Sequence, residues 1–307
     1  MSILDKQITA IEKDAAQGAS GEKSLEIASV CTPQQSTSLL EEQQSATPAL
    51  EACNLTLVWG NGQVVAKDIS IELQPGTITC LVGRSGCGKT TLLHALAGLL
   101  HPQQGKVLLH GSDVTGHPGH IGYMLQKDLL IPSKRIIDNV ALPLELKGVS
   151  RAEARAQAQE MLKRGGLERV AKSWPHELSG GMRQRVAFLR TALIGSDIML
   201  LDEPFSALDA LTRREMRVWL MSSVKEFGLS VLVITHDVDE AVAMASRIYV
   251  MAGSPAQGIV TKIVGLVEPQ GCSDVAVDDP SQQTDLASFD LSAEFLAAKR
   301  EVLSLLG

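Results

Sequence analysis

The chain has 307 residues, of which 45% are hydrophobic, and carries a formal net charge of -7. This length and apolar content can bury one large α/β domain with a small subdomain, and the acidic balance gives no electrostatic basis for general nucleic-acid binding. The five cysteines, at positions 31, 53, 80, 87 and 272, show no paired metal-ligand spacing and are typical of a reducing compartment.

No run of the sequence approaches the 18 or more apolar residues needed to cross a bilayer, and the N-terminus lacks the basic-then-apolar order of a secretion signal. We therefore expect any membrane function to depend on separate subunits. Residues 1–48 are rich in Ser, Gln, Glu, Ala and Thr with sparse apolar periodicity, so we expect a largely disordered extension there. A short helix within it, for example from Ile3 to Ile11, stays open.

The segment Gly83–Thr90 has the pattern G-x-x-x-x-G-K-[ST] and directly follows an apolar, strand-like run from Ile78 to Val82. Glycines let the backbone wrap around an anion, and the helix expected from about Thr90 points its free N–H groups at the phosphates. Lys89 adds a mobile positive charge, and Thr90 supplies a hydroxyl for Mg²⁺. The pattern predicts a nucleotide triphosphate site formed by Gly83, Ser85, Gly86, Cys87, Gly88, Lys89, Thr90 and Thr91.

Two further polar groups follow apolar runs that are typical of buried strands. Ile198 to Leu201 precedes the carboxylates of Asp202 and Glu203, and Val231 to Thr235 precedes His236. Open α/β sheets place their ligands at such strand ends. Asp202 could hold the metal while Glu203 orients or deprotonates a water, although a solvated Asp-Glu pair or a structural histidine is the alternative for each alone.

Five elements in order carry a family resemblance: Gly83–Thr90, Leu178-Ser-Gly-Gly-Met-Arg-Gln-Arg185, Ile198-Met-Leu-Leu-Asp-Glu-Pro204, Ser206-Ala-Leu-Asp209 and Val231-Leu-Val-Ile-Thr-His236. Over about Leu50 to Val267 the chain resembles the ATP-binding cassette (ABC) ATPases. The resemblance implies an α/β P-loop NTPase fold of ABC type, with a mostly parallel central sheet, an antiparallel β subdomain and an inserted helical subdomain. We expect this domain over about 49–270, with the helical subdomain over about 127–178.

The resemblance also implies roles for individual residues. Asp202 matches the Mg²⁺ aspartate, Glu203 the general base and His236 the switch histidine. Gln126 matches a glutamine that reaches the metal and the attacking water. Trp59 lies where the family keeps an aromatic that stacks on adenine, although a tryptophan here could also be a core or surface residue.

Ser179, Gly180 and Gly181 match the family signature and open a helix expected to reach Leu193, which makes a second anion-binding helix N-terminus. The family pairs two cassettes head to tail, so each signature caps the γ-phosphate held by the other chain. Ser206 to Asp209 match the family's D-loop, which makes Asp209 a further nucleotide-binding residue. We therefore expect a homodimer or paired cassette around two ATP molecules. Met182, where many members have glutamine, leaves the serine hydroxyl and glycine N–H groups in place.

The remaining segments suggest contacts with other subunits. Ser150-Arg-Ala-Glu153 forms a capping box and Gly165 follows as a stop, which predicts a helix of about 14 residues in the helical subdomain that grips a permease. Lys127 to Val140 could dock a permease helix or simply pack internally. After a polar stretch from residue 271, Leu291, Phe295, Val302 and Leu306 recur at the spacing of a terminal amphipathic helix within 271–307.

The motif combination is similar to the ATPases of bacterial nitrate, sulfonate and taurine importers, and Phe188-Leu-Arg-Thr191 to the branch for the thiamine pyrimidine precursor, hydroxymethylpyrimidine. The implied function is ATP hydrolysis by a peripheral subunit on the cytoplasmic face of the bacterial inner membrane. Its partners would be transmembrane permease subunits and, through them, a periplasmic or lipoprotein substrate-binding protein. A soluble non-transport ABC ATPase and an ATP-binding regulatory subunit are the alternatives.

Overall fold

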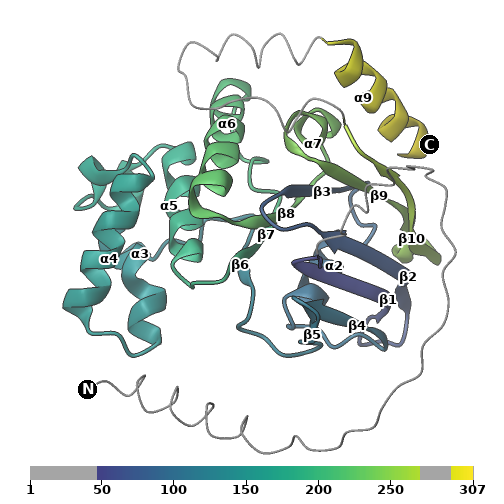
Figure 1. The fold of residues 1–307 in the computed structure, drawn as a ribbon, viewed down its shortest axis with the longest axis horizontal. Helices are drawn as coiled ribbons and strands as arrows, with labels where there is room; N and C mark the ends of the chain where they lie inside the picture. The colour runs from purple at the N-terminus through teal and green to yellow at the C-terminus, as the bar shows by residue number, and fades with distance from the viewer. Residues whose placement is uncertain (1–46, 270–291, 307) are drawn as a thin grey trace, which may run out of the picture. The chain divides into compact units, whose positions relative to one another are not determined.

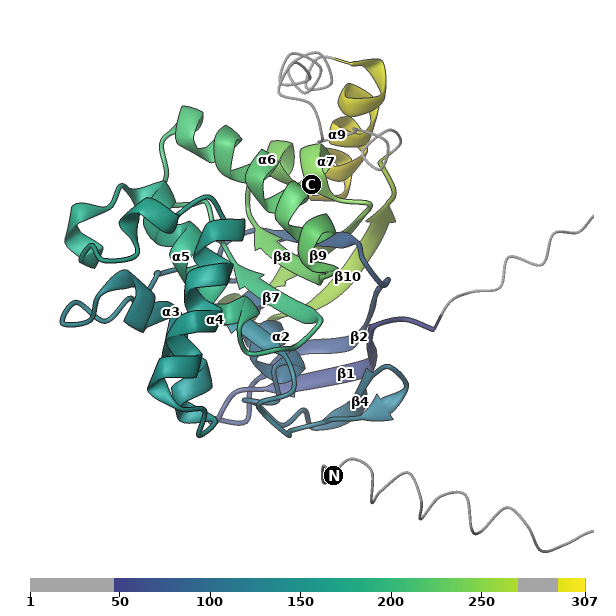
Figure 2. The same cartoon turned by 60° about the vertical axis from the view of Figure 1, so that its left-hand side comes forward.

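The computed structural model of the chain describes residues 47–269 and 292–306 (Figure 1, Figure 2). The predicted N-terminal extension, apart from residues 47 and 48, and the predicted polar linker between residues 271 and 291 lie outside the described residues. Within the two described ranges, no helix combines the length and the apolar composition that crossing a bilayer requires.

The described part of the chain folds around a ten-stranded sheet with the order β5-β4-β1-β2-β10-β9-β3-β8-β7-β6. Strands β9, β3, β8, β7 and β6 pair in parallel, whereas β4, β1 and β2 pair antiparallel, as do β9 and β10. This arrangement confirms the expected mostly parallel central sheet with an antiparallel β part. The strands are β1 (Leu50–Val58), β2 (Val64–Leu73), β3 (Ile78–Gly83), β4 (Gln104–Leu109), β5 (Ser112–Asp113), β6 (Gly122–Met124), β7 (Ile198–Asp202), β8 (Ser230–Thr235), β9 (Arg247–Ser254) and β10 (Ile259–Val267).

The helices lie on both faces of the sheet, as Figures 1 and 2 show. Helix α2 follows β3 directly, as the phosphate-loop pattern predicted. The α-helices are α2 (Lys89–Leu96), α3 (Ile136–Leu146), α4 (Arg151–Arg164), α5 (Gly180–Ala192), α6 (Ala210–Phe227), α7 (Val238–Met244) and α9 (Ala293–Leu306). Three short 3-10 turns complete the described elements: η1 (Glu168–Val170), η2 (Pro175–Glu177) and η3 (Pro255–Gln257).

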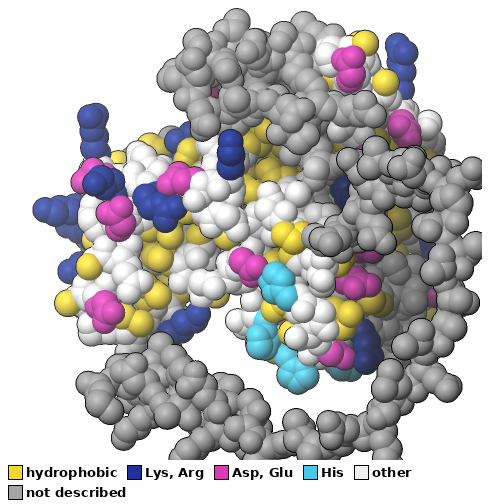
Figure 3. Space-filling view, in the orientation of Figure 1, with side chains coloured by type: hydrophobic (Ala, Val, Ile, Leu, Met, Phe, Trp, Pro, Cys, Tyr) yellow, Lys and Arg dark blue, Asp and Glu magenta, His cyan; other side chains and the backbone are white. Residues whose placement is uncertain are grey.

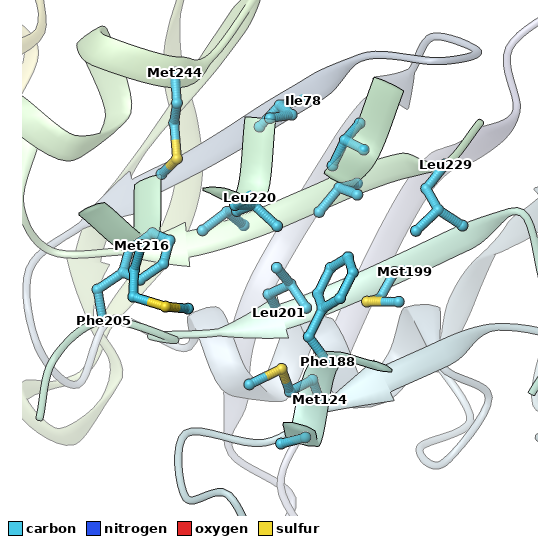
Figure 4. Packing of buried hydrophobic residues seen from close by; sticks show 14 of the residues in the cluster. Ile78, Met124, Phe188, Met199, Leu201, Phe205, Met216, Leu220, Leu229 and Met244 are labelled. Atoms are coloured by element: carbon cyan, nitrogen blue, oxygen red, sulfur yellow. The ribbon is translucent and has the colours of Figure 1, made fainter. Parts of the chain in front are cut away.

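The parallel strands are buried on both faces, so alternate residues of one strand belong to two different hydrophobic cores. In β7, Leu200 faces the core formed with α2 and the antiparallel strands, and Leu201 faces the core formed with the helices of the other side. On that second side, Phe188 of α5 and Met216 of α6 point toward Leu201 (Figure 4). The central strands are therefore held from both faces, which fixes where their ends lie.

Helices α3 and α4 lie within the predicted helical subdomain of about 127–178, and both pack against α5, which follows it. The predicted α4 is confirmed: the Ser150 hydroxyl accepts a hydrogen bond from the Glu153 N–H at its start, and Gly165 follows its end. Gly165 ends the helix as predicted, with φ -77°, and it also allows close packing, because an added Cβ would lie 2.5 Å from Leu189. The left-handed residue is the next one, Gly166, with φ 71°.

Helix α9 packs against α7, β9 and β10 and contributes Phe295, Ala298 and Val302 to the hydrophobic core. Lys299 forms an ion pair of 2.6 Å with Asp239 at the start of α7. The predicted terminal amphipathic helix is thus confirmed from residue 293 onward, while Leu291 lies outside the described residues.

Candidate functional site

Four neighbouring strands bring the predicted polar residues to one edge of the sheet. Strands β3, β8, β7 and β6 lie side by side and run parallel, so their carboxyl ends meet. The phosphate loop follows β3, His236 follows β8, Asp202 ends β7 and Gln126 lies just beyond β6. These residues are spread along the chain from Gly83 to His236 but share one site because of the strand order.

The phosphate loop wraps around its own lysine. The ammonium of Lys89, which is buried, donates hydrogen bonds to the carbonyls of Gly83 (2.8 Å) and Arg84 (3.1 Å). Gly88 has φ 103° and precedes the first turn of α2, a conformation that favours glycine. The loop therefore gathers the N–H groups of the helix start and one ammonium around a space suited to an anion.

The Cys87 thiol faces away from that space. Its side chain is buried, and an added Cβ on Gly83 would lie 2.9 Å from its sulfur. Burial raises the pKa of this thiol, so it stays protonated near neutral pH. The structure therefore favours a small filler role for the Cys87 side chain over a reactive thiol, and only its backbone can face a phosphate.

Thr90 and Asp202 present two oxygens to the same point. The Thr90 hydroxyl, on the first turn of α2, lies 3.1 Å from the carboxylate of Asp202 at the end of β7. Burial raises the pKa of Asp202, and the neighbouring Glu203 adds to that effect while the Thr90 hydrogen bond opposes it. A buried carboxylate whose charged form is disfavoured in this way gains from a cation. This oxygen donor set fits Mg²⁺, which prefers carboxylate and hydroxyl oxygens.

Tyr123 of β6 completes the surroundings of Asp202. Its hydroxyl is buried and interacts with the Asp202 carboxylate, and its ring packs edge-on against His94 of α2, with centroids 5.8 Å apart. Burial raises the pKa of Tyr123, and the Asp202 charge raises it further. The phenol therefore stays neutral, as a polar group beside the carboxylate. Sequence analysis missed it because an aromatic residue in a strand is ordinary core material.

Glu203 is the meeting point of the site. One oxygen of its carboxylate lies 3.3 Å from the Gln126 amide nitrogen and 3.3 Å from Nδ1 of His236. Its φ of 44° is uncommon for a residue with a side chain and is held by a backbone hydrogen bond to the Ile234 carbonyl. Ser206 links back to it, because its hydroxyl donates to the Glu203 carbonyl and contacts Gln126 at 3.1 Å.

The turn that carries His236 is fastened on both sides. The Thr235 hydroxyl donates to Glu240 at 2.6 Å and accepts from the Asp237 N–H at 3.0 Å. The Asp237 carboxylate in turn accepts from the first N–H groups of α7. Burial raises the pKa of Glu240, against the opposing effect of the Thr235 hydrogen bond. These hydrogen bonds thus restrain the turn that carries the exposed imidazole of His236, and sequence analysis did not identify them.

The signature residues lie elsewhere in the same chain. Ser179 caps α5, where its hydroxyl accepts from the Met182 N–H, and α5 packs against α3, α4, α6 and β6. An added Cβ on Gly181 would lie 2.8 Å from Thr212, so the start of α5 touches the start of α6. Asp209 caps α6 through the Thr212 N–H and hydroxyl, and these hydrogen bonds lower its pKa. The structure therefore brings Ser179, Gly180 and Gly181 together with the Asp209 loop.

Trp59 stands at a tight turn after β1. Its N–H donates to the Gln63 carbonyl at 2.9 Å, and its side chain is exposed. The Gln63 side-chain amide donates to the Pro255 carbonyl, which ties this turn to the loop after β9. Of the alternatives for this tryptophan, the core position is wrong, and its ring is free for a ligand.

A hollow of about 600 Å³ opens beside Gln126. It is lined by Gln126, Lys127, Asp128, Leu129, Leu130, Gln184, Ser206 and Ala207. Leu129 is 54% exposed there, whereas Leu130 is buried, so part of the predicted docking segment faces out and part packs inward. Over the helices α3 and α4, acidic side chains are interspersed with lysines and arginines, and histidines lie on the β4 and β5 side (Figure 3).

Comparison with known proteins adds independent findings. The profile of the ABC transporter family matches residues 66–206. The chain is 43% identical over 198 residues to the taurine import ATP-binding protein TauB of Pseudomonas aeruginosa, which covers 64% of this chain and 75% of that protein. It is 41% identical over 203 residues to the nitrate import ATP-binding protein NrtC of Synechococcus elongatus, covering 65% of this chain and 31% of that protein.

Two solved structures have a similar fold. The structure of cbiO1 from Clostridium perfringens, part of the transporter complex cbiONQ, matches with a TM-score of 0.66 at 23% identity, covering 80% of this chain and 98% of that chain. A dimeric post-hydrolysis state of the ATP-binding cassette MJ0796, bound to ADP and Pi, matches with a TM-score of 0.61 at 30% identity, covering 72% of this chain and 99% of that chain.

Proposed function

The chain belongs to the ABC transporter family, and on this premise we propose that it is the ATP-hydrolysing subunit of an importer that works with a separate permease. One observation carries the chemical part: the Glu203 carboxylate meets both Gln126 and His236 at 3.3 Å, beside the phosphate loop. The relatives that are named import ATP-binding proteins support the importer over a soluble ATPase or a regulatory subunit.

ATP binding would use the two ends of the site. The N–H groups of Gly86 through Thr91 and the Lys89 ammonium would surround the phosphates, once Lys89 exchanges its loop carbonyls for phosphate oxygens. The exposed ring of Trp59 would stack on the base. The hydrogen bonds of Lys89 to the two loop carbonyls would keep its charge in place until phosphate oxygens replace them.

Hydrolysis needs a water that is aligned with the terminal phosphate. We assign that task to Glu203 as the base, with Gln126 orienting the water and His236 donating a hydrogen bond to the phosphate. Thr90 and Asp202, with Gln126 nearby, would hold Mg²⁺, which neutralises charge on the phosphate oxygens when bound. The fastened turn of His236 and the constrained backbone of Glu203 keep the two groups aligned, which lowers the entropy cost of reaching the reactive geometry.

A second copy of the chain would complete each site. Ser179 to Gly181 form a helix start with free N–H groups, yet they lie beside α6 instead of the phosphate loop of their own chain. A head-to-tail pair would place this start, and the neighbouring Asp209 loop, on the ATP held by the partner. In this arrangement the helix start at Ser179 to Gly181 binds the phosphate of the partner's ATP, whereas within one chain it would duplicate the phosphate loop.

The permease would dock at the hollow beside Gln126, where the exposed Leu129 offers an apolar contact. Because Gln126 lines this hollow, a movement of the docked permease would shift Gln126 and so change the position of the hydrolytic water. Docking on the permease would hold the chain at the cytoplasmic face of the bacterial inner membrane. A periplasmic or lipoprotein substrate-binding protein would deliver the solute to the permease from the other side.

The transported solute would belong to the taurine, sulfonate and nitrate group, with the thiamine pyrimidine precursor as the second candidate. The similarity to TauB and NrtC supports small polar solutes of this group. This chain contacts no solute itself, since selection falls to the permease and binding protein. Its own residues therefore determine ATP binding and hydrolysis, and not which solute is transported.

The test combines uptake and hydrolysis. In the source organism, deletion of the gene should abolish uptake of one labelled solute among taurine, nitrate and the pyrimidine precursor. The wild-type gene should restore that uptake, and Lys89→Ala should not, although it reaches the same cellular level. If the Lys89→Ala protein supports uptake at the wild-type rate, or the purified wild-type chain fails to hydrolyse ATP, the proposed function is wrong.

A further inference from the structure

The hairpin formed by β9 and β10 lies directly behind the phosphate loop. Thr261 of β10 is fully buried and is paired across the sheet with Ala66 of β2. On its other side, an added Cβ on Gly253 of β9 would lie 2.4 Å from the Thr261 hydroxyl. Thr261 is therefore enclosed between two strands, and its side chain has little freedom to turn.

The Thr261 hydroxyl reaches the loop. It donates a hydrogen bond of 2.5 Å to the backbone carbonyl of Cys87, across 174 positions of sequence. Cys87 is flanked by Gly86 with φ 80° and Gly88 with φ 103°, two residues whose backbones rotate easily. Without an anchor, the peptide between Cys87 and Gly88 could turn over at little steric cost.

The hydrogen bond from Thr261 to the Cys87 carbonyl also sets the direction of the next backbone donor, the Gly88 N–H. In a planar trans peptide, the N–H points opposite to the carbonyl of the same unit. Because Thr261 holds the Cys87 carbonyl toward the hairpin, the Gly88 N–H is aimed away from the hairpin. Gly88 caps α2, so this N–H belongs to the group of donors at the helix start that faces an anion.

We propose that Thr261 is a positioning residue for nucleotide binding, which acts through the Cys87 carbonyl to hold the Cys87–Gly88 peptide in the orientation that receives phosphate. The inference rests on the proposed function, since it concerns the same nucleotide. It adds a determinant outside the loop, on a strand with no contact to ATP of its own. Loss of the hydroxyl would leave the fold largely intact but let the peptide leave its binding orientation.

The test uses Thr261→Val in the purified full chain, since valine keeps the shape and removes the hydroxyl. With Mg²⁺ and ADP, which fills the loop without being hydrolysed, calorimetry should give an affinity about tenfold weaker, equivalent to about 1.4 kcal/mol. In ATP hydrolysis, KM should rise by a similar factor while kcat changes less than about twofold, because the lost interaction acts on substrate and transition state alike. Thr261→Ser should bind ADP like the wild type.

Thr79→Val is the matched control. Thr79 is fully buried on β3, and its hydroxyl has no hydrogen-bond partner among the described residues. Its removal should leave ADP affinity within about twofold of the wild type. An equal loss in Thr79→Val and Thr261→Val would overturn the inference, because general packing would then explain both.

A second pair keeps the test decisive if Thr261→Val does not fold. Thr261→Ser and Thr261→Ala differ by one oxygen, and only the alanine protein should lose ADP affinity, when both are measured well below their melting transitions. Equal affinity of these two proteins rules the inference out. Failure of the wild type itself to bind ADP would instead contradict the proposed function, so the two failures are distinguishable.

Discussion

The hydroxyl of Thr90 lies 3.1 Å from the carboxylate of Asp202, although the two residues are 112 positions apart. This contact joins the start of α2 to the end of β7, and both oxygens are suited to Mg²⁺. Asp202→Asn keeps the size of the side chain and removes its charge. We expect the gain in ADP affinity that Mg²⁺ provides in the wild type to shrink by about tenfold or more.

Titrations with ADP in Mg²⁺ and in a chelator measure this directly. The affinity in the chelator should stay near the wild-type value, because the phosphate loop is unchanged. A full Mg²⁺ effect in Asp202→Asn would remove this residue from the metal site.

Glu203→Gln tests the base. Glutamine keeps the contacts to Gln126 and His236 but cannot accept a proton, so turnover should fall by about 10²–10⁴-fold while ATP binding is retained. The ATP-bound dimer should accumulate and be visible by gel filtration. Steady-state hydrolysis close to the wild-type rate would show that another group activates the water.

A mixture of two mutants tests whether the site is shared between chains. Lys89→Ala disables the phosphate loop of its own chain, and Ser179→Arg blocks the helix start that it offers to its partner. Neither homodimer should trap ATP. A heterodimer regains one intact site, so about one trapped ATP per heterodimer should return, measured with labelled nucleotide after rapid filtration.

Trapped ATP is a safer measure than turnover, because full turnover could require both sites. Heterodimer formation is verified with two different tags. Recovery of no ATP in verified heterodimers would contradict the shared site, and normal trapping by Ser179→Arg alone would remove the signature from it.

The Asp138–Arg155 pair should stabilise the helical subdomain. Arg155 of α4 donates two hydrogen bonds, of 2.7 and 2.9 Å, to the nearly buried carboxylate of Asp138 on α3. Arg155→Ala leaves this carboxylate poorly paired, and the free energy of unfolding should fall by about 1–3 kcal/mol at pH 7. Arg151→Ala, which removes an exposed partner at 3.5 Å, should cost less than about 1 kcal/mol.

The same pair predicts a pH dependence. Burial alone would raise the pKa of Asp138, but the hydrogen bonds and charge of Arg155, with those of Arg151, outweigh burial and lower it. A lowered folded-state pKa stabilises the fold above the unfolded-state pKa of about 3.9, and the stabilisation is lost as the pH falls through the folded-state value. In urea unfolding, the gap between wild type and Arg155→Ala should be constant from pH 7 down to about 5 and close below about 4.

Phe295→Ala tests whether α9 belongs to the core. Phe295 is 4% exposed and packs with α7, so its truncation should lower the free energy of unfolding by about 3–5 kcal/mol. Leu296, the next residue, is 42% exposed, and Leu296→Ala should cost less than about 1 kcal/mol. Equal effects would mean that α9 does not pack on the domain in solution.

Local chemistry made part of this structure predictable. The phosphate-loop pattern predicted α2 within one residue, and the Ser150 cap predicted α4, because both signals act within a turn of the helix they begin. Short apolar runs predicted the strands that end near Asp202 and His236, since strands buried on both faces need no alternation. The residues that determine these helices and strands lie within or next to them in the sequence.

Contacts between distant segments could not be predicted in the same way. Nothing in the sequence near Thr261 or Tyr123 indicates that their hydroxyls face Cys87 and Asp202, because both contacts depend on strand order. The fit of Gly165 against Leu189 is another case, since the helix stop was predicted but its close packing against a distant residue was not. Sequence patterns identify the participants of the site, and the sheet determines which of them meet.

Strand order also dictates when the site can form during protein synthesis. Strand β3 lies between β8 and β9, so both of its edges stay unpaired until residues 230–254 have left the ribosome. The nascent chain must therefore carry an apolar strand with open hydrogen-bonding edges through most of its translation, at about 5–20 residues per second. A chain that stops before residue 230 has a complete phosphate-loop sequence but lacks β8 and β9, the two strands that pair with β3. We therefore expect such a fragment to expose both edges of β3 and to bind no nucleotide.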